Sequence, residues 1–508
     1  MLLPKRRSRK SEGVDFVPVC QEGSLEYQAL DDAVPADHPA RELAEAFKHL
    51  DLTEFLKSYR GQGSLPYRPD LLLQAVLYEM RQGKQKPQEW FTDSRENQVV
   101  QWLLQGCRPS RSRWYAFRDR LAPWLEKWHE QLGHWAVAQN VTPAKRAALD
   151  GSLIAANASR HRLVNVKTLA KRLEQLEHVT ADPREQKPHD APAWMAPTRS
   201  GRAEQLARYR QAAERMAQRQ QYNQEKRSSK RKPRDKIVVS VSEPESALGR
   251  DKLGTYRPLY NVQVLRDLDS PLFLGYGVFA QPNDNNTLGP MLERQAHLVG
   301  HKVEVLLGDS TYGCGADLAV AEANGVTVYA PWQKNDYSDS KKKKAPQIPK
   351  TDFAWLPDEQ TYQCPQGHRL QALGWRNDKR SSTDTVRVQQ FRCPAEHCRV
   401  CPVRARCTKS PESGRTISRG EHDELIDALR VRMETPEAKE LYKLRRQTIE
   451  LAYADTKEHR ELRRFSGHGL RRAETEVALL TLVHNLLNVY RAVAARPTTV
   501  AIPLEIAA

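Results

Sequence analysis

Three acidic residues stand where metal-dependent chemistry could be built. Asp150 ends the short apolar run 147–149, Asp309 follows the strand-like run 303–307, and Glu450 lies in a basic stretch with a helical pattern. Carboxylates at two strand ends and on one late helix can form an oxygen cage for divalent cations, and such cages serve phosphoryl transfer on nucleic acids. If the three side chains converge, the sequence predicts an enzyme that cuts and joins DNA.

The stretch around Glu450 adds cations to this set. Arg446, Glu450 and Lys457 are separated by four and seven residues, which predicts that they share one face of a helix. A carboxylate flanked by cations could hold both a metal ion and DNA phosphates. Each feature alone has a simpler interpretation, because a strand-end aspartate is more often a turn or cap residue and the helix could carry a surface ladder of ion pairs.

The chain is long and strongly basic. Its 508 residues are enough for roughly two to four domains. Lys and Arg outnumber Asp and Glu by 80 to 63, for a net charge of +17, which favours nucleic acid as a partner over a merely basic soluble protein. No apolar run approaches the roughly 18 residues that cross a bilayer. The basic N-terminus lacks the apolar core of a secretory signal, so we expect no membrane association and a cytoplasmic location.

The N-terminal part has a helical pattern over residues 31–144, after a polar segment 1–30 that we expect to be flexible. Ser110 is placed as an N-cap for a helix over 111–121. A DNA-docking helix needs an apolar back and a cationic front. The candidates for that cationic front are Arg111, Arg113 and Arg118. An ordinary amphipathic helix with solvated arginines is the alternative.

The remaining chain alternates strand and helix patterns in the way that a mixed α/β sheet requires. The segments assigned to this sheet and its helices are 145–160, 237–335 and 420–495. A polar, basic and helix-favouring stretch over 161–236 is predicted to be a helical insertion. A cysteine-rich insertion follows over 336–419, and residues 496–508 are a tail.

Four of the eight cysteines fall between Cys393 and Cys407. In a reducing compartment such a cluster indicates metal binding sooner than disulfide bonds. One Cys-x2-Cys knuckle with two further thiols could supply four tetrahedral zinc ligands. His368 and His397 are additional candidates, as is Cys393 itself, so the ligand set stays open. Free thiols packed in a small insert are the alternative.

Three segments together resemble a known family. They are 149–152 (Leu-Asp-Gly-Ser), 308–313 (Gly-Asp-Ser-Thr-Tyr-Gly) and 442–457. This pattern is similar to bacterial insertion-sequence transposases of the DDE class, in the group with a Tyr-Arg-Glu-Lys signature, and the resemblance covers most of the chain. It implies an α/β fold with a ribonuclease-H-like mixed sheet flanked by helices. It also implies an all-α N-terminal domain, a helical insertion and a small cysteine-rich insertion.

The resemblance assigns roles residue by residue. The catalytic carboxylates, which would hold two Mg²⁺ or Mn²⁺ ions, are Asp150, Asp309 and Glu450. The residues implied to contact DNA are Tyr442, Arg445, Arg446 and Lys457. The positions that match the family's cysteine-rich insertion, as zinc ligands, are Cys364, Cys398, Cys401 and Cys407. Arg445 lies at the signature's distance after Tyr442, whereas Arg446 lies at the signature's distance before Glu450. One of Tyr442 and Arg445 therefore departs from the pattern.

The function implied by the resemblance is DNA transposition. The enzyme would bind the terminal inverted repeats of its element, cleave strands with metal ions, and transfer them to double-stranded target DNA, acting as a homodimer in the bacterial nucleoid. Two alternatives remain open at this stage. One is a catalytically inactive, transposase-derived DNA-binding protein, and the other is a metal-dependent nuclease that cuts DNA without joining it.

Overall fold

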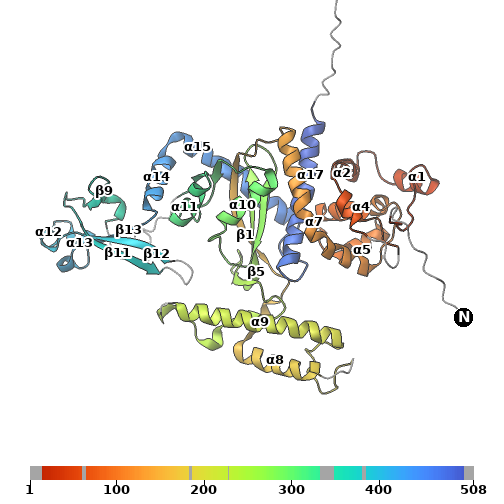
Figure 1. Ribbon diagram of the computed structural model, residues 1–508, viewed down its shortest axis with the longest axis horizontal. Coiled ribbons are helices and arrows are strands. Elements are labelled where there is room, and N and C mark those ends of the chain that lie inside the picture. Colours follow the sequence, from red (N-terminus) through yellow and green to blue (C-terminus); the bar gives the residue numbers. More distant parts are fainter. Residues whose placement is uncertain are drawn as a thin grey trace, which may run out of the picture.

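The computed structural model describes residues 14–59, 65–181, 186–226, 228–331, 348–379 and 385–496. A central sheet lies between an all-helical N-terminal region and a cysteine-rich region, and two long helices lie below it (Figure 1). Residues 1–13 of the predicted flexible segment and 497–508 of the predicted tail lie outside the described residues. The prediction of a loose segment up to residue 30 is wrong at its end, because Leu25–Asp32 forms helix α1, capped by the Ser24 hydroxyl.

The N-terminal region is helical, as its periodicity predicts. Its further helices are α2 (Pro39–Phe47), α3 (Thr53–Lys57), α4 (Pro69–Arg81), α5 (Pro87–Glu96), α6 (Gln98–Leu103) and α7 (Arg111–Ala138). Pro69 opens α4 because its missing N–H and fixed φ suit a first helical turn. Gly83 follows the end of α4 with a φ of +78°, a conformation that costs glycine little.

Helix α7 begins where the sequence predicts but is much longer. Ser110 occupies the N-cap position, yet its side chain accepts no capping hydrogen bond from the helix. The helix continues through Pro123 to Ala138 because its apolar face continues. The buried side chains along that face are Trp114, Phe117, Leu121, Leu125, Trp128 and Leu132.

The main sheet has the strand order β4-β5-β1-β7-β8, and β6 also pairs with β5. The strands are β1 (Arg146–Ala155), β4 (Ala247–Arg250), β5 (Tyr256–Asp267), β6 (Phe273–Phe279), β7 (Val305–Leu307) and β8 (Thr327–Tyr329). Strand β1 pairs antiparallel with β5 and parallel with β7, so the predicted mixed α/β sheet is confirmed. Helices α10 (Leu288–Val299) and α11 (Gly315–Ala323) connect β6 to β7 and β7 to β8.

The helical insertion folds around its own small core. It contains β2 (Leu163–Asn165), α8 (Val166–Ala181), α9 (Arg199–Glu225) and β3 (Val238–Ser240). The buried side chains shared by these elements include Leu169, Leu176, Tyr209 and Met216. Strand β3 pairs with β2 and not with the main sheet, so the assignment of 237–241 to the central sheet is wrong. The local pattern predicts a strand but not its partner.

The cysteine-rich region is a separate small β structure with its own core. Its elements are β9 (Ala354–Leu356), β10 (Thr361–Gln363), β11 (Gln371–Lys379), β12 (Thr385–Arg392), α12 (Ala395–Arg399), α13 (Arg404–Cys407) and β13 (Thr416–Gly420). Short 3-10 helices also occur along the chain, namely η1 (Arg160–Arg162), η2 (Ser228–Lys230), η3 (Arg234–Lys236), η4 (Lys350–Asp352) and η5 (Pro411–Ser413).

The C-terminal part is helical, with two π-helical segments. Its elements are α14 (Asp423–Glu434), α15 (Pro436–Arg445), the π segment η6 (Arg446–Glu450), α16 (Leu451–Ala454), the π segment η7 (Asp455–His459) and α17 (Leu470–Ala494). Within the described residues one helix, α17, is long and apolar enough to cross a membrane. This finding corrects the expectation that no such run exists. However, 61% of its apolar window is buried in the protein, where α17 packs on α7, α4 and β6.

Candidate functional site

Asp150 and Asp309 lie side by side at the centre of the sheet. Asp150 is the fifth residue of β1, so the expectation that it ends a strand is wrong. Strands β1 and β7 are parallel neighbours, and Ala148 is level with Leu307. Asp150 lies two residues after Ala148, and Asp309 lies two residues after Leu307, the last residue of β7. The same register therefore places the two aspartates level with each other just beyond the end of β7. Two segments that are distant in the sequence therefore present carboxylates at one place.

The carboxyl group of Asp150 lies in a crowded electrostatic environment. Burial raises its pKa above the ordinary range, and the charges of Asp309 and Asp284 act in the same direction. Arg445 opposes this shift through an ion pair in which Nη2 lies 3.1 Å from Asp150 Oδ2. The N–H of Gly151 donates to Asp150 Oδ1 at 2.9 Å. The site thus concentrates negative charge that cations must balance.

The late helical segment faces both aspartates. The Tyr442 hydroxyl donates to the carbonyl oxygen of Gly308, directly before Asp309, at 3.0 Å. Burial raises the pKa of Tyr442, and the carboxylates of Asp309, Asp150 and Glu450 raise it further against the opposing charge of Arg445. All three predicted catalytic carboxylates therefore act on the Tyr442 hydroxyl.

The structure distinguishes the two neighbouring arginines. Arg445 points into the site, and its side chain is 14% exposed. The side chain of Arg446 is 86% exposed and lies 3.8 Å from Glu450, which is itself 55% exposed. The spacing from Arg446 to Glu450 assumes a regular α-helix, in which residues four apart share a face. The segment is a π-helix, in which an extra residue in one turn places residues five apart on a shared face. Tyr442 and Arg445 both reach the site, and the Arg446–Glu450 pair lies at its rim.

Lys457 reaches the strand that carries Asp150, as its Nζ donates to the hydroxyl of Ser152. Burial lowers the pKa of Lys457 to about 8, and the charges of Lys252 and Arg463 contribute to this shift. The prediction that Lys457 shares a face with Arg446 is wrong, because Arg446 is solvated whereas Lys457 packs on β1.

Tyr453 fixes the same helical segment to the sheet. Its hydroxyl oxygen lies 2.8 Å from the carbonyl oxygen of Asp150 and 2.7 Å from that of Val262. Burial raises the pKa of Tyr453 well above its usual value. The tyrosine therefore remains a neutral donor that joins this segment to both β1 and β5.

A polar network on the other side of β1 escapes the sequence analysis. Asp284 Oδ1 accepts hydrogen bonds from Asn261 Nδ2 at 2.8 Å and from Gln263 Nε2 at 2.5 Å. The Tyr312 hydroxyl, on the segment that carries Asp309, donates to Gln263 Oε1 at 2.7 Å. A Cβ atom at Gly151 would lie 2.0 Å from Asp284 Oδ1. Asn261 and Gln263 are buried amides at alternate positions of the apolar strand β5, and this pattern in the sequence could have indicated the network.

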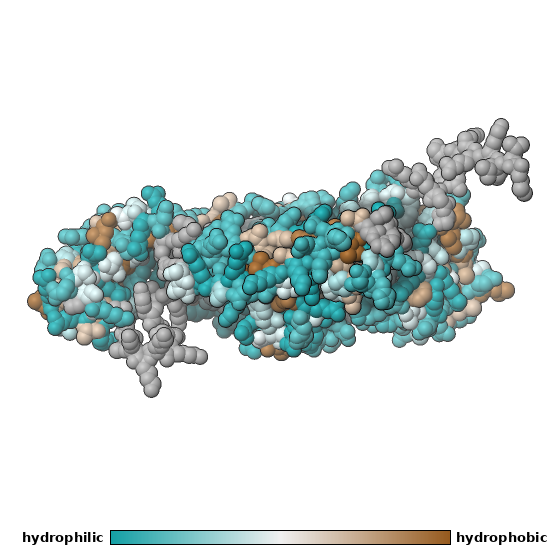
Figure 2. Space-filling model, turned by 90° about the horizontal axis from the view of Figure 1, so that it is seen from below, coloured by the Kyte–Doolittle hydropathy of each residue, from teal (hydrophilic) through white to brown (hydrophobic). Residues whose placement is uncertain are grey.

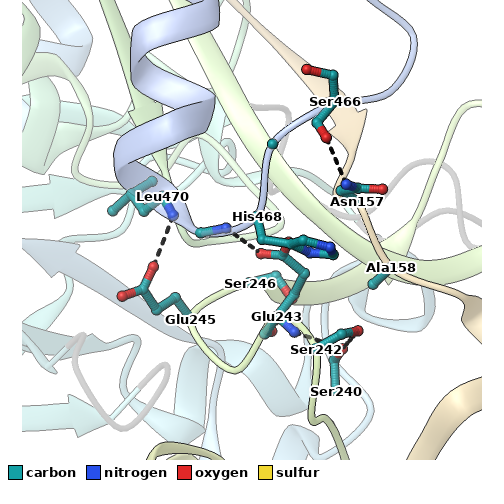
Figure 3. Close-up of polar contacts among 12 residues, drawn as sticks. Asn157, Ala158, Ser240, Ser242, Glu243, Glu245, Ser246, Ser466, His468 and Leu470 are labelled. Carbon is teal, nitrogen blue, oxygen red and sulfur yellow. Dashed lines mark hydrogen bonds and ion pairs between the residues drawn. The ribbon is translucent and has the colours of Figure 1, made fainter. Parts of the chain in front are cut away.

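The start of α17 is held by two glutamates that follow the insertion (Figure 3). Glu243 Oε1 lies 2.8 Å from His468 Nδ1, and Glu243 Oε2 accepts from the N–H of Gly469 at 2.9 Å. Glu245 Oε2 accepts from the N–H of Leu470 at 2.8 Å. Carboxylates satisfy the free N–H groups of a helix N-terminus and complement its dipole. This junction fixes the insertion against the helix that packs on the sheet.

The predicted DNA-facing arginines of α7 do not all face solvent. Arg111 and Arg113 are exposed, so they stay candidates for DNA contact. Arg118 is only 4% exposed and pairs with Asp119 at 2.8 Å, so the prediction that it projects outward is wrong. Helical spacing placed Arg118 beside Trp114 and Leu121, whose face is buried.

The cysteines gather in the small core of their region. Cys393, Cys398 and Cys407 are buried with the partly buried Cys364, and burial raises the pKa of the Cys393 thiol next to Cys398 and Cys364. The nearby rings of His368 and His397 stack at 4.1 Å. Cys401 is partly exposed, and its charge acts on Cys407.

Neither candidate metal set is preformed. In the part of the chain that the structure describes, no group of three or more His, Cys, Asp or Glu side chains is arranged so that it could hold a metal ion. The zinc ligand set remains a prediction from the sequence.

Comparison with known proteins finds a family model that matches part of the chain. A family model described as a transposase DDE domain matches residues 363–490. The match contains Arg445, Glu450 and Lys457 but not the two aspartates, and it spans a minor part of the chain. No curated protein matches the sequence. The match supports a DDE-type transposase and indicates a nuclease or transferase enzyme with DNA as its partner.

Proposed function

We propose that the protein is a DNA transposase that binds the terminal inverted repeats of its element, cleaves DNA strands and transfers them to target DNA. The observation that carries this proposal is that Asp150 on β1 and Asp309 just after the adjacent parallel strand β7 are level, facing the segment that carries Glu450. The transposase-domain match over that segment supports the same function independently.

The strand order supports a ribonuclease-H-like catalytic core. Strands β6, β5 and β1 form an antiparallel set, and β7 and β8 extend it in parallel beyond β1. Strands β1 and β7 are thereby neighbours, which is what places Asp150 next to Asp309. A two-metal polynucleotidyl transferase needs carboxylates close enough to hold ions about 3.5–4 Å apart, and neighbouring strands can supply them.

The donor chemistry of the site fits Mg²⁺ or Mn²⁺. Oxygen donors from carboxylates are those that these ions prefer. Burial is the main cause that raises the pKa of Asp150, and the nearby carboxylates of Asp309 and Asp284 add negative charge that a divalent cation would balance. Asp150, Asp309 and Glu450 would hold two ions, which when bound stabilise the attacking and leaving oxygens. Rearrangement of Arg445 and Glu450 would accompany that binding, because Arg445 now occupies Asp150 Oδ2.

The chain's own cations have a separate task. A water molecule would attack the phosphorus at the element end and release a 3′ hydroxyl, which would then attack a phosphodiester of the target. Arg445 pairs with the Asp150 carboxylate and Lys457 donates to Ser152, two residues further along β1, and both would hold the phosphates that flank the reacting one. Tyr442 would keep the Asp309 segment in place through its hydrogen bond to Gly308.

The remaining DNA contacts are assigned to basic surfaces away from the carboxylates. The exposed Arg111 and Arg113 at the start of α7 would grip the repeat. The insertion with α8 and α9 would extend this contact, since Figure 2 shows that the face it occupies is predominantly hydrophilic. Binding of two element ends would require two copies of the protein on the DNA.

A strand-transfer assay tests the proposal. Purified protein is mixed with labelled element-end DNA, a target plasmid and Mg²⁺ or Mn²⁺, beside Asp309→Asn and the matched control Asp358→Asn, whose aspartate is exposed in the cysteine-rich region. We expect cleavage and joining by the wild type and the control, and DNA binding without either product by Asp309→Asn.

The assay also separates the two alternatives. Binding of element ends without any metal-dependent cleavage by the wild type would favour an inactive DNA-binding protein. Cleavage without joined product would favour a nuclease. Wild-type product levels from Asp309→Asn would refute the assignment of the site itself.

A further inference from the structure

The hairpin between β4 and β5 has a rigid tip that presents an apolar side chain to solvent. Leu253 is 88% exposed at this tip. Asp251 Oδ1 accepts hydrogen bonds from the N–H groups of Leu253 and Thr255 at 3.0 and 2.9 Å. Its other oxygen, Oδ2, pairs with Arg257 at 3.0 Å, and Gly254 supplies a φ of +76°. The turn is thus held from within.

The tip also belongs to a band of cations that leads to the catalytic carboxylates. Lys252 is exposed next to Leu253, and among the described residues it forms no ion pair. Its charge acts on Lys457, which donates to Ser152 on the strand of Asp150. On the other side, Lys232 Nζ lies 6.0 Å from the ring centroid of Tyr256, so the exposed basic run before β3 adjoins the same hairpin.

Asp150 and Glu458 offset part of the positive charge around Lys457, and the acidic groups beside this band have partners of their own. Asp251 is turned inward to Arg257, and Glu458 pairs with Arg463. Lys252 and Lys457 therefore repel each other unless an anion lies between them, and a chain of phosphates fits a band of spaced cations. Single exposed leucines are common on protein surfaces. This leucine differs in being held by a hydrogen-bonded turn inside a cationic band beside the active site.

We propose that the β4–β5 hairpin tip is a DNA-contacting element in which Lys252 binds a backbone phosphate and Leu253 packs against bases next to the cleaved phosphodiester. This inference rests on the proposed transposase function. Apolar side chains that enter base steps unstack them and distort the duplex, which would give the enzyme access to the strand end. The neighbouring lysines would anchor the backbone on both sides of the opened step.

Fluorescence of 2-aminopurine tests the role of Leu253. The probe is a duplex of the element's terminal repeat with 2-aminopurine next to the cleaved bond, bound by protein in the Asp309→Asn background so that it stays uncut. We expect a several-fold rise in fluorescence that Leu253→Ser abolishes and Leu253→Met retains. Leu25→Ser is the matched control, since Leu25 is 87% exposed on α1.

Salt dependence tests the role of Lys252. Removal of one phosphate contact should make the slope of log affinity against log salt shallower by about 0.9. We expect this change in Lys252→Ala but not in Lys302→Ala, because the exposed Lys302 precedes β7 at the opposite end of the sheet. In the otherwise wild-type protein, Leu253→Ser should slow cleavage about tenfold with less than threefold loss of binding.

The outcomes separate this inference from the proposed function. If the wild type cleaves and joins DNA while Leu253→Ser and Lys252→Ala match it in fluorescence, salt slope and rate, the hairpin inference is overturned and the transposase function stands. If the wild type binds DNA without cleaving it, the proposed function fails, and the fluorescence and salt slopes still decide whether the tip contacts DNA. A change of oligomeric state in Leu253→Ser without these DNA effects would assign the tip to protein contact and refute the inference.

Discussion

Arg445 pairs with Asp150 across the interface between the late helical segment and strand β1, with Nη2 and Oδ2 3.1 Å apart. This ion pair joins the part of the chain that matches a transposase domain to the strand that carries the first predicted catalytic aspartate. It also identifies which of two consecutive arginines belongs to the site.

Replacement of Arg445 should therefore be much more damaging than replacement of its neighbour. We expect Arg445→Ala to slow DNA cleavage about 100-fold, the loss typical of removing one group that stabilises transition-state charge. Arg446→Ala should stay within about threefold, because the Arg446 side chain is largely solvated. Single-turnover nicking rates measure both. Equal losses in the two variants would contradict the assignment of Arg445.

The same variant should change the pH dependence of cleavage. Arg445 lowers the pKa of Asp150 against the effect of burial, so its removal should raise that pKa further. Because the ionised carboxylate is the active form, the acid limb of the rate profile should move to higher pH in Arg445→Ala. Cleavage rates measured from about pH 5 to about pH 8 in steps of roughly half a pH unit test this shift, and an unshifted acid limb would show that the pair has no influence.

Lys457 should limit activity on the alkaline side. Its pKa is lowered to about 8, so the ammonium is present below that pH and is lost as the pH rises through it. At pH 9 about one tenth of the molecules would keep the charge, and cleavage should fall about tenfold. Lys457→Arg stays charged and should lack this decline. A wild-type rate that stays constant to pH 9 would show that the charge of Lys457 is not required.

Gly151 should not tolerate a side chain. A Cβ atom would lie 2.0 Å from Asp284 Oδ1 and 2.2 Å from Gln263 Nε2, and both groups are held in the network behind β1. We expect Gly151→Ala to lower the free energy of unfolding by about 1–3 kcal/mol. Urea denaturation measures the loss.

A glycine with room beside it provides the control for that experiment. The nearest atom to a Cβ at Gly289 is Val320 Cγ1 at 3.5 Å, which is an ordinary contact. Gly289→Ala lies in helix α10 and should be neutral or stabilising by up to about 1 kcal/mol. Equal stability of Gly151→Ala and the wild type would show that the network yields without cost.

The junction at the start of α17 should depend on the charge of Glu243. Its side chain is fully buried, and it accepts hydrogen bonds from Tyr260 and Gly469 beside His468. We expect Glu243→Gln to cost about 1.5–3 kcal/mol of stability, the range for hydrogen bonds to a charged group. Glu245→Gln, which is only partly buried, should cost less than about 1 kcal/mol. Thermal unfolding that ranks the two variants in the opposite order would refute this account.

Local sequence signals predicted most elements around the site but not their partners. Pro69, the apolar face of α7 and the strand before Asp309 are each readable from a few neighbouring residues. The strand at 238–240 was also readable, yet it pairs with β2 because the insertion needs it to close its own core. Pairing between strands depends on packing that no short window of sequence contains.

Residue types and short-range periodicity by themselves determined the mixed α/β class, the basic character and the acidic residues worth testing. Only the tertiary structure decided that Arg445 enters the site, that Arg118 is buried, and that Asp284 lies against Gly151. The physical reason is that helical spacing shows which residues share a face, but not whether that face is buried or which strand it meets. Contacts between distant segments arise when the sheet aligns them, and spacing along the chain does not encode that alignment.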